Sequence, residues 1–234
     1  MQGSLISIVL PVHNQGDHIC CLVESYRAAL AAQVVIPFEI VLVTNACTDS
    51  SPQMCQALAA RYGDVKAVDI SQGGWGRSVR VGLKSATGDL LCYTNSARTS
   101  PDVLIAAIKF AISNPNSVIK ANRKIRDNWR RRLGSLIYNL ECRAFFDLPT
   151  WDINGTPKIF PRSFDKLLEL QRDDDVIDAE FSAICRRAPY QVLEVPVVST
   201  KRHGGNSTTN YRSAFKMYWG AFKLWISMQQ QPSR

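Results

Sequence analysis

The sequence predicts an α/β fold with a mostly parallel β-sheet that helices flank on both faces. Apolar, β-branched runs such as residues 5–10 and 38–43 carry hydrophobic side chains at nearly every position, which is typical of strands buried on both faces. Each run is followed by a segment with helical periodicity. Strands that alternate with helices along the chain are the pattern of a parallel sheet, because each helix crosses back over the sheet to start the next strand.

The first half of the chain is expected to alternate strands and helices in a regular order. The first strand stops at Pro11, and Pro101 opens a helix at the position where a helix accommodates proline best. The expected strands are residues 5–10, 38–43, 65–70 and 90–93. The expected helices are residues 17–32, residues 51–62, a helix from the glycines at 73–76 to residue 86, and the helix that begins at Pro101.

The second half of the chain is less regular. A basic run over residues 120–132 leads into a long helix that ends near residue 146. Residues 151–161 contain glycine and proline and predict turns with short strands. A helix over 176–186 and a strand over 192–198 follow. The polar, glycine-bearing residues 201–210 predict a loop. The acidic residues 173–175 are expected to form a helix N-terminal cap rather than a metal cluster.

Composition narrows the class of protein. The 234 residues include 46% hydrophobic and 21% charged residues, which suits a globular chain and excludes a disordered one. The cysteines number 7 and contain no C-x-x-C pair, so a disulfide framework or a zinc ribbon is not expected. The formal net charge of +8 favours a phosphate-bearing or membrane partner. We expect no signal peptide and no membrane span, and therefore a cytoplasmic protein.

The C-terminal segment carries the clearest periodic pattern. We expect residues 1–210 to form the α/β domain and residues 211–234 an amphipathic helix and tail. An aromatic stripe runs along one face of this helix, with lysines beside it. It consists of Tyr211, Phe215, Tyr218, Trp219, Phe222, Trp225 and Ile226. Two interpretations stay open: the stripe packs into the core, or it lies on the surface of a membrane.

Small and polar residues follow the strands expected in the first half. They occupy residues 11–14, 44–49, 72–77 and 94–96. The carboxyl ends of parallel strands meet at one edge of the sheet, and ligands of open α/β sheets bind at that edge. The sequence therefore predicts a nucleotide-binding site there.

These segments, in this order, resemble the family 2 glycosyltransferases. Residues 7–14 are similar to that family's first strand and nucleotide-binding turn, and residues 43–51 to its Asp-rich turn. The spacing of glycines over residues 72–82 is similar to its N-x-G-x-G-x-A-x-x-x-G helix start, and residues 86–89 to its A-x-G-D. The resemblance implies the GT-A fold, in which residues 1–210 are the glycosyltransferase domain, and a nucleotide-sugar donor.

The second half resembles the dolichyl- and polyprenyl-phosphate sugar transferases within that family. The similar segments are Arg123, the D-x-x-x-x-x-K-x-F stretch over 152–160, Asp178-x-Glu180, the E-V-P-V of 194–197 and the R-x-x-G-x-S of 202–207. This resemblance implies inverting transfer of a sugar to a polyprenyl phosphate at the cytoplasmic face of the membrane. Transfer to a polysaccharide and binding of a nucleotide sugar without catalysis stay open as alternatives.

The resemblance also implies two sets of site residues. The donor nucleotide is expected to contact Pro11, His13, Asn14, Asn45, Asp49, Gly74, Arg77, Asn95 and Ser96. The acceptor phosphate and the sugar are expected to be held by Arg123, Asp152, Lys158, Arg202 and Ser207.

The sequence departs from the family at its metal motif. Where the family carries D-x-D for Mg²⁺ or Mn²⁺, this chain has Thr94-Asn95-Ser96, and hydroxyl or amide oxygens alone are poor ligands for a hard cation. We therefore name no metal ligands, and two interpretations stay open: Arg and Lys neutralise the donor diphosphate in place of a metal, or catalysis has been lost. Mg²⁺ or Mn²⁺ as a cofactor also stays open. The expected partners are a nucleotide sugar, a polyprenyl phosphate or another lipid-linked acceptor, and an anionic membrane surface. Nucleic acid is not expected, because the basic run matches no recognition motif.

Overall fold

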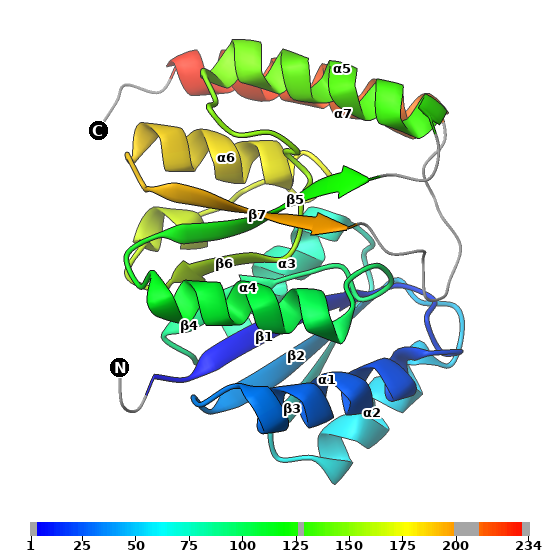
Figure 1. Ribbon diagram of the computed structural model, residues 1–234. Helices are drawn as coiled ribbons and strands as arrows, with labels where there is room; N and C mark the ends of the chain where they lie inside the picture. Colours follow the sequence, from blue (N-terminus) through cyan, green and yellow to red (C-terminus); the bar gives the residue numbers. More distant parts are fainter. Residues whose placement is uncertain (1–3, 126–128, 199–210, 231–234) are drawn as a thin grey trace.

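The computed structural model describes residues 4–125, 129–198 and 211–230 (Figure 1). Its centre is a seven-stranded sheet in the order β3-β2-β1-β4-β6-β5-β7. The strands are β1 (Ile6–Val12), β2 (Phe38–Asn45), β3 (Val65–Ile70), β4 (Leu90–Tyr93), β5 (Val118–Ile125), β6 (Lys158–Pro161) and β7 (Val192–Val198). The paired strands run parallel except β6, which is antiparallel to both β4 and β5. The predicted mostly parallel sheet is confirmed.

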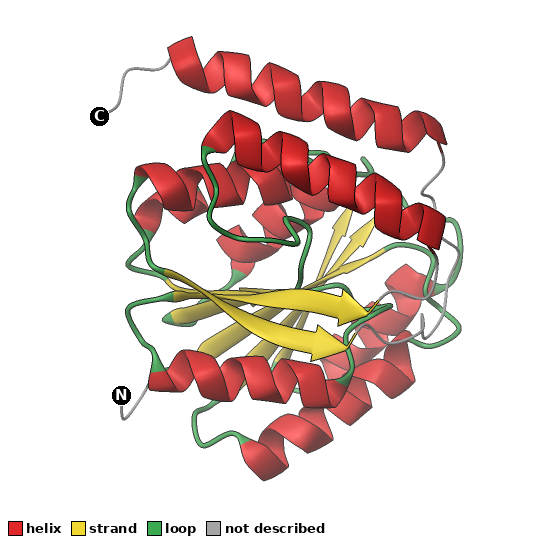
Figure 2. Cartoon of the chain, turned by 45° about the horizontal axis from the view of Figure 1, so that its top comes forward, coloured by secondary structure: helices red, strands yellow, loops and turns green. Residues whose placement is uncertain are grey.

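Helices cover both faces of this sheet (Figure 2). They are α1 (Ile19–Gln33), α2 (Ser51–Arg61), α3 (Trp75–Ser85), α4 (Pro101–Ser113), α5 (Trp129–Phe146), the 3₁₀ helix η1 (Asp165–Leu168), α6 (Ile177–Arg187) and α7 (Tyr211–Gln230). Each lies within a few residues of the range expected from the sequence, apart from η1, which the periodicity did not indicate. None of the helices over the described residues is long and apolar enough to cross a membrane.

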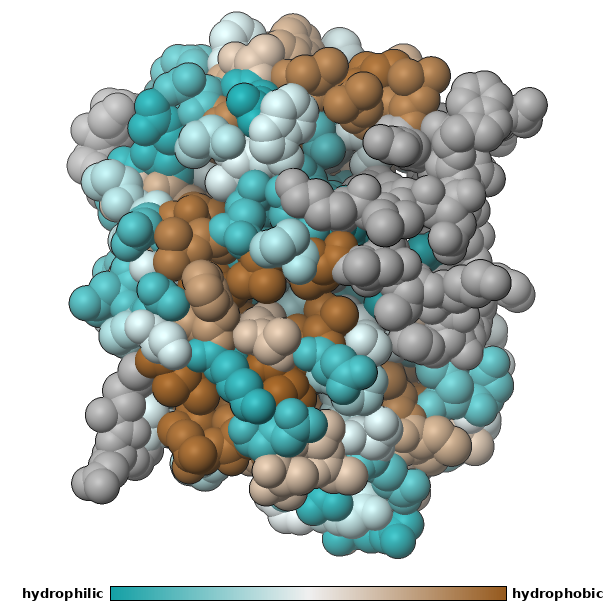
Figure 3. Space-filling model, viewed as in Figure 1, coloured by the Kyte–Doolittle hydropathy of each residue, from teal (hydrophilic) through white to brown (hydrophobic). Residues whose placement is uncertain are grey.

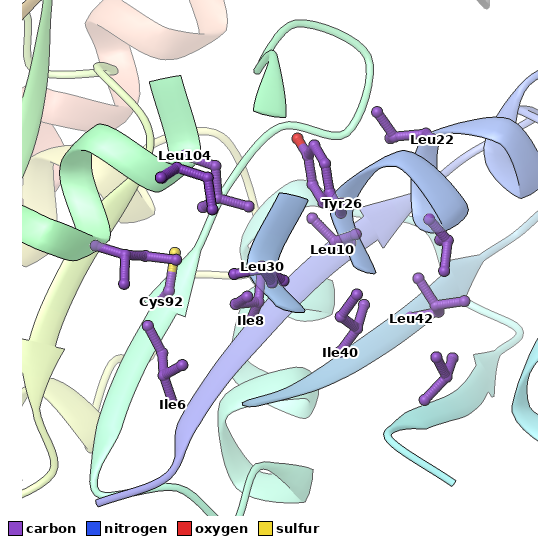
Figure 4. Packing of buried hydrophobic residues seen from close by; sticks show 14 of the residues in the cluster. Ile6, Ile8, Leu10, Leu22, Tyr26, Leu30, Ile40, Leu42, Cys92 and Leu104 are labelled. Atoms are coloured by element: carbon purple, nitrogen blue, oxygen red, sulfur yellow. The ribbon is translucent and has the colours of Figure 1, made fainter. Parts of the chain in front are cut away.

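Two hydrophobic clusters pack against opposite faces of the sheet because side chains alternate along each strand. On one face, Ile8 and Leu10 of β1 lie under Tyr26 and Leu30 of α1 (Figure 4). On the other face, Val9 packs with the residues of α3 and α6. All five side chains are fully buried. This double burial explains why β1 is apolar at nearly every position.

Helix α3 approaches the sheet closely enough to require glycine. A Cβ placed on Gly82 would lie 2.2 Å from Cγ1 of Val9, well inside van der Waals contact. The helix start is equally tight, because a Cβ on Gly76 would lie 2.3 Å from the carbonyl oxygen of Arg172. The glycine spacing of residues 72–82 therefore sets the distance of α3 from β1, and with it the position of the donor-side loops.

Helices α5 and α7 lie side by side above α6 and form a third layer (Figures 1 and 2). The hydroxyl of Tyr218 donates to the carbonyl of Gly134 near the start of both helices, at 2.7 Å. Near their ends, the rings of Phe145 and Trp225 stack with centroids 5.4 Å apart. The two helices therefore run in the same direction.

The aromatic stripe of α7 does not form one buried face. The buried residues of this helix are small or aliphatic, and include Ala221, Leu224 and Met228. By contrast, Phe215 is 70% exposed and Trp219 is 50% exposed. The core interpretation is therefore wrong for these two side chains, whereas the side chain of Tyr211 lies outside the described residues.

Helix α5 adds to this apolar surface. Its exposed large hydrophobic residues recur at helical spacing and lie between 44% and 51% exposed: Leu133, Leu136, Ile137 and Leu140. We call these four residues, together with Phe215, Trp219 and Ile226 of α7, the α5–α7 apolar face. Figure 3 shows hydrophobic residues gathered over this helix pair at the top of the molecule. Isolated surface hydrophobics are ordinary, but a contiguous group on two adjacent helices is typical of an interaction surface.

Candidate active site

The loops after β1 and β2 meet the start of α3 at the carboxyl edge of the sheet. Nδ1 of His13 lies 2.7 Å from the carbonyl oxygen of Asn45. The amide of Asn45 donates to the carbonyl of Val12 at 2.9 Å and accepts from the backbone N–H of Gly74 at 3.4 Å. These bonds join three predicted donor-binding residues, and the exposed imidazole of His13 lies on the outer side of the cluster.

A second set of bonds fixes the first loop to the second. Asn14 adopts a left-handed conformation with φ of 50°, and its side-chain oxygen Oδ1 accepts from the backbone N–H of Thr48 at 2.8 Å. The carboxylate of Asp49 accepts from the N–H of Gly16 at 2.9 Å and of Ser51 at 3.0 Å. Burial alone would raise the pKa of Asp49, but these hydrogen bonds outweigh it and lower the pKa. The negatively charged Asp49 therefore links the two donor-side loops through its hydrogen bonds.

In the segment that replaces the D-x-D motif, the side chains of Thr94 and Ser96 point into the protein interior. The side chains of Thr94 and Ser96 have no exposed surface. The hydroxyl of Thr94 lies 2.7 Å from that of Thr99. The hydroxyl of Ser96 lies 3.0 Å from the carbonyl of Pro11 and 2.7 Å from Oε1 of Gln15. Here the predicted donor residues Pro11 and Ser96 bond to each other, through a backbone carbonyl and a hydroxyl.

The residues present at this position do not fit a divalent metal ion. Oδ1 of Asn95, the central residue, already accepts from the N–H of Ala97 at 3.0 Å. Across the described part of the chain, no group of three or more His, Cys, Asp or Glu side chains is placed to hold a metal ion. We therefore derive no step of the reaction through a metal, and the interpretation that Arg and Lys act in its place stays a prediction.

The start of α3 is bound by the segment before α6. The guanidinium of Arg77 pairs with Asp173 at 2.7 Å, and Arg80 pairs with the same carboxylate. The backbone N–H of Arg77 also donates to the carbonyl of Asp173 at 3.0 Å. The hydrogen bond from Arg77 is the main cause that lowers the pKa of Asp173. A pocket of about 380 Å³ opens here, lined by Gly73, Gly74, Gln171, Arg172, Asp173 and Asp174.

The acidic residues 173–175 act differently from one another. Asp174 accepts from the N–H of Val176 at 3.1 Å, as expected of an acidic residue at the start of a helix. Asp173 instead crosses to α3, so the expectation that it caps α6 is wrong. The reason is tertiary: α3 brings two guanidinium groups to within ion-pair distance of this one carboxylate.

Arg123 and Asp152 form a two-pronged ion pair near the end of β5. Nε and Nη2 of Arg123 lie 2.7 and 2.6 Å from the two carboxylate oxygens, and the backbone N–H of Arg123 donates to Asp152 at 2.9 Å. Burial would lower the pKa of Arg123, but the hydrogen bond to Asp152 outweighs it and raises the pKa. The two parallel hydrogen bonds fix the orientation of the guanidinium plane, which an ammonium group does not achieve.

Lys158 lies inside the protein. Its side chain has no exposed surface and pairs with Asp178. Its ammonium group also donates to the carbonyl of Ile153 at 3.0 Å, and the hydroxyl of Tyr93 donates to Asp178 at 2.9 Å. Burial lowers the pKa of Lys158 to about 8. In this conformation the ammonium group cannot contact an acceptor phosphate, so the role predicted for Lys158 would have to be indirect.

The last two predicted acceptor residues, Arg202 and Ser207, lie outside the described residues. Two side chains that the sequence did not single out also build this edge. Oε1 of Gln15 accepts a hydrogen bond from the hydroxyl of Ser96, and Oδ1 of Asn139 in α5 accepts one from the backbone N–H of Ile153 at 3.1 Å. Gln15 lies three residues after β1, in the polar loop where binding residues are expected, so its position was a usable signal, whereas Asn139 lies in a long helical pattern that gives no signal.

The mostly parallel, seven-stranded sheet with helices on both faces matches solved structures of GT-A glycosyltransferases. Residues 7–168 match the family described as Glycosyl transferase family 2, so the chain belongs to this family. The mycobacterial glucosyl-3-phosphoglycerate synthase, solved with Mn²⁺, uridine diphosphate and phosphoglyceric acid, matches with a TM-score of 0.71 over 97% of this chain and 78% of that chain, at 15% identity. The mannosyltransferase PcManGT of Pyrobaculum calidifontis, solved with GDP-Man and Mn²⁺, matches with a TM-score of 0.55 over 86% of this chain and 57% of that chain, at 19% identity.

Curated relatives share a single description, undecaprenyl-phosphate 4-deoxy-4-formamido-L-arabinose transferase. The protein of Serratia proteamaculans is 28% identical over 140 residues, which is 58% of this chain and 42% of the relative. The protein of Aeromonas hydrophila is 22% identical over 207 residues, which is 87% of this chain and 62% of the relative. The chain thus spans about half the length of the curated relatives it matches.

Proposed function

We propose that this protein transfers a sugar, with inversion, from a nucleotide-sugar donor to a polyprenyl phosphate at a membrane surface. One observation carries the choice of a lipid acceptor: the helix that presents much of the α5–α7 apolar face is bonded directly to the loop of Asp152. The side-chain oxygen of Asn139 in α5 accepts a hydrogen bond from the backbone N–H of Ile153, the residue next to Asp152. An acceptor phosphate at Arg123 would then lie beside a surface suited to its apolar chain.

The donor half of the proposal rests on the loops at the carboxyl edge. His13, Asn45 and Gly74 would contact the nucleotide, since they lie together where open α/β sheets bind ligands. Gly74 and Gly76 at the start of α3 let the backbone of residues 172–174 approach closely, and this segment forms one side of the pocket. Structural relatives with uridine diphosphate or GDP-Man bound support a nucleotide sugar as donor.

The acceptor half needs no strong base. A lipid phosphate is an anion at neutral pH, so one of its oxygens can form the new bond to sugar C1 while the bond from C1 to the diphosphate breaks. The nucleoside diphosphate leaves with the electron pair, and the configuration at C1 inverts. What the protein must supply is orientation of the phosphate in line with the breaking bond. Arg123 would hold it, with Asp152 fixing the guanidinium plane.

Charge on the leaving diphosphate must also be neutralised. Arg77 is 29% exposed at the donor edge and is proposed to take part in this task. Arg202 and Ser207, which lie outside the described residues, are proposed to complete the site as a second guanidinium and a hydrogen-bond donor. Positioned cations can stabilise developing negative charge as a metal ion does.

Membrane contact by the α5–α7 apolar face completes the proposal. Exposed rings such as Phe215 and Trp219 would enter the head-group region, and the exposed Lys216 and Lys223 would attract anionic lipids. The curated relatives named for an undecaprenyl-phosphate acceptor support this choice of acceptor.

Nucleotide release from a panel of nucleotide sugars, with and without a short polyprenyl phosphate, tests the proposal. We expect release that depends on the lipid phosphate. Release that requires a soluble saccharide instead would contradict the lipid acceptor. A second candidate function, binding without transfer, is favoured by the inward-facing Thr94 and Ser96, and donor binding without release under any condition would support it.

A further inference from the structure

Two buried lysines lie beside each other in the sheet. Lys120 of β5 is the register partner of Lys158 of β6, and their side chains are 1% and 0% exposed. Each ammonium group is shared between a carboxylate and a backbone carbonyl. Lys120 pairs with Glu194 at 3.0 Å and donates to the carbonyl of Trp151. Lys158 pairs with Asp178 and donates to the carbonyl of Ile153 at 3.0 Å.

The two carbonyls belong to residues on either side of Asp152. Asp152 itself adopts a left-handed conformation with φ of 48°, which is uncommon for a residue other than glycine. The turn that follows is also tight, since a Cβ on Gly155 would lie 1.9 Å from the carbonyl oxygen of Ala121. Two ammonium groups, the backbone of β5 and Asn139 therefore hold this short loop from different sides.

Fold stability does not explain this arrangement. Taking an ammonium group and a carboxylate out of water costs several kcal/mol per ion, and a buried ion pair is often no more stabilising than apolar residues of similar volume. The chain nonetheless buries two such pairs on adjacent strands, and the ammonium group of each pair also donates a hydrogen bond to a backbone carbonyl of the same loop. What the pairs do produce is a fixed position for Asp152 against Arg123.

We infer that Lys120 and Lys158 are a positioning pair that holds residues 151–153, so that Asp152 keeps Arg123 oriented for the acceptor phosphate. The inference rests on the proposed function for the identity of the acceptor. Neither lysine touches substrate, because both are buried. Their loss should therefore affect the acceptor step and leave donor binding intact, since the donor loops lie on β1, β2 and α3.

Lys120 is the better residue to change, because its partner Glu194 can be neutralised in the same variant. Lys120→Met alone would leave the Glu194 charge without its ion pair, so Lys120→Met with Glu194→Gln is the main variant. Lys66→Met is the matched control, since Lys66 also pairs with a carboxylate, that of Glu39, but lies at the opposite end of the sheet. Asn139→Ala is a second variant that releases the same loop without changing any charge.

Amide hydrogen exchange of residues 150–155 and steady-state kinetics test the inference together. In the double variant we expect loop exchange to rise at least about tenfold while the rest of the sheet keeps its protection. Turnover with the acceptor should fall on the order of 10- to 100-fold, with the KM for the donor unchanged. Asn139→Ala should raise the same exchange, and Lys66→Met should change neither quantity.

The outcomes separate this inference from the proposed function. If a folded double variant keeps wild-type loop exchange, the positioning pair is refuted whatever the reaction. If the loop loosens but the wild-type protein transfers no sugar to a lipid phosphate, the proposed function fails and the structural part of the inference stands. A double variant that does not fold leaves the decision to Asn139→Ala, whose unchanged exchange would overturn the inference.

Discussion

Replacing two exposed aromatic residues of α7, in the variant Phe215→Ser with Trp219→Ser, should weaken membrane binding without unfolding the protein. These side chains are 70% and 50% exposed. For aromatic side chains of roughly 200 Å², these fractions correspond to about 100–140 Å² of apolar area each. At about 25 cal/mol per Å², full transfer of both out of water would contribute roughly 6 kcal/mol. An interfacial position removes only part of that area from water, so we expect a loss of about 3 kcal/mol.

A loss of this size is on the order of a 100-fold fall in the partition coefficient. Cosedimentation with anionic phospholipid vesicles measures it, and thermal unfolding of the same variant provides the stability readout. The melting temperature should move by less than about 2 °C, because neither ring is buried.

Trp225→Ser is the matched control on the same helix. Trp225 is partly buried and stacks on Phe145 with centroids 5.4 Å apart, so its loss should cost about 2 kcal/mol and lower the melting temperature by roughly 4–8 °C. Unchanged vesicle binding by the Phe215 and Trp219 variant would refute the reasoning. A large fall in its melting temperature would refute it too, because these side chains would then belong to the core.

Three further predictions concern metal, charge and pH. Nucleotide release should persist in EDTA, because Thr94 and Ser96 supply no carboxylate; complete loss that Mg²⁺ or Mn²⁺ restores would reveal metal ligands elsewhere. Arg202→Ala should cost on the order of 2–4 kcal/mol in kcat/KM, with partial recovery in Arg202→Lys, and wild-type turnover would remove this residue from the mechanism. Burial raises the pKa of Glu39, but bonds from Lys66, Ser7 and Thr87 outweigh it and lower the pKa from 4.5 to about 2. The ionised Glu39 therefore stabilises the folded state fully above pH 4.5, and this contribution, on the order of 3 kcal/mol, is lost as the pH falls through 2. In urea unfolding at a series of pH values, Glu39→Gln should lack this part of the loss of stability in acid.

The sheet was predictable because local and global preferences agree. Strands such as β1 are buried on both faces, so their apolar runs are unmistakable in the sequence. The antiparallel direction of β6 was not predictable, because a strand of only four residues carries no signal of direction. Its pairing depends on where α5 ends and how residues 147–157 return to the sheet.

The buried face of α7 shows where periodicity fails. Aromatic side chains at helical spacing indicate an amphipathic helix, but they do not tell which face packs inward. Gly220 determines which face of α7 packs inward, because a Cβ at this position would lie 2.6 Å from Cγ2 of Val176. Close approach of α7 to α6 therefore turns Gly220 and Ala221 inward and leaves Trp219 exposed.

The contacts of the candidate site could not be predicted from the sequence, and the roles of its residues stay predictions. Arg123 and Asp152 are 29 positions apart, and only the fold brings them together as an ion pair. Lys120 opens the basic run over 120–132, where a solvated charge would be the ordinary expectation, yet its side chain is buried. The partner of a buried charge cannot be read from a linear motif, because it comes from another strand or helix.

Transfer of a radiolabelled sugar from its nucleotide donor to a short polyprenyl phosphate, followed by extraction into organic solvent, tests the central claim most directly. The account predicts label in the lipid phase as a sugar-phosphate lipid whose anomeric configuration is opposite to that of the donor, and formation of this product in the presence of EDTA. Label that stays in the aqueous phase while the donor is consumed would contradict the lipid acceptor, and a product with the configuration of the donor would contradict direct attack by the phosphate.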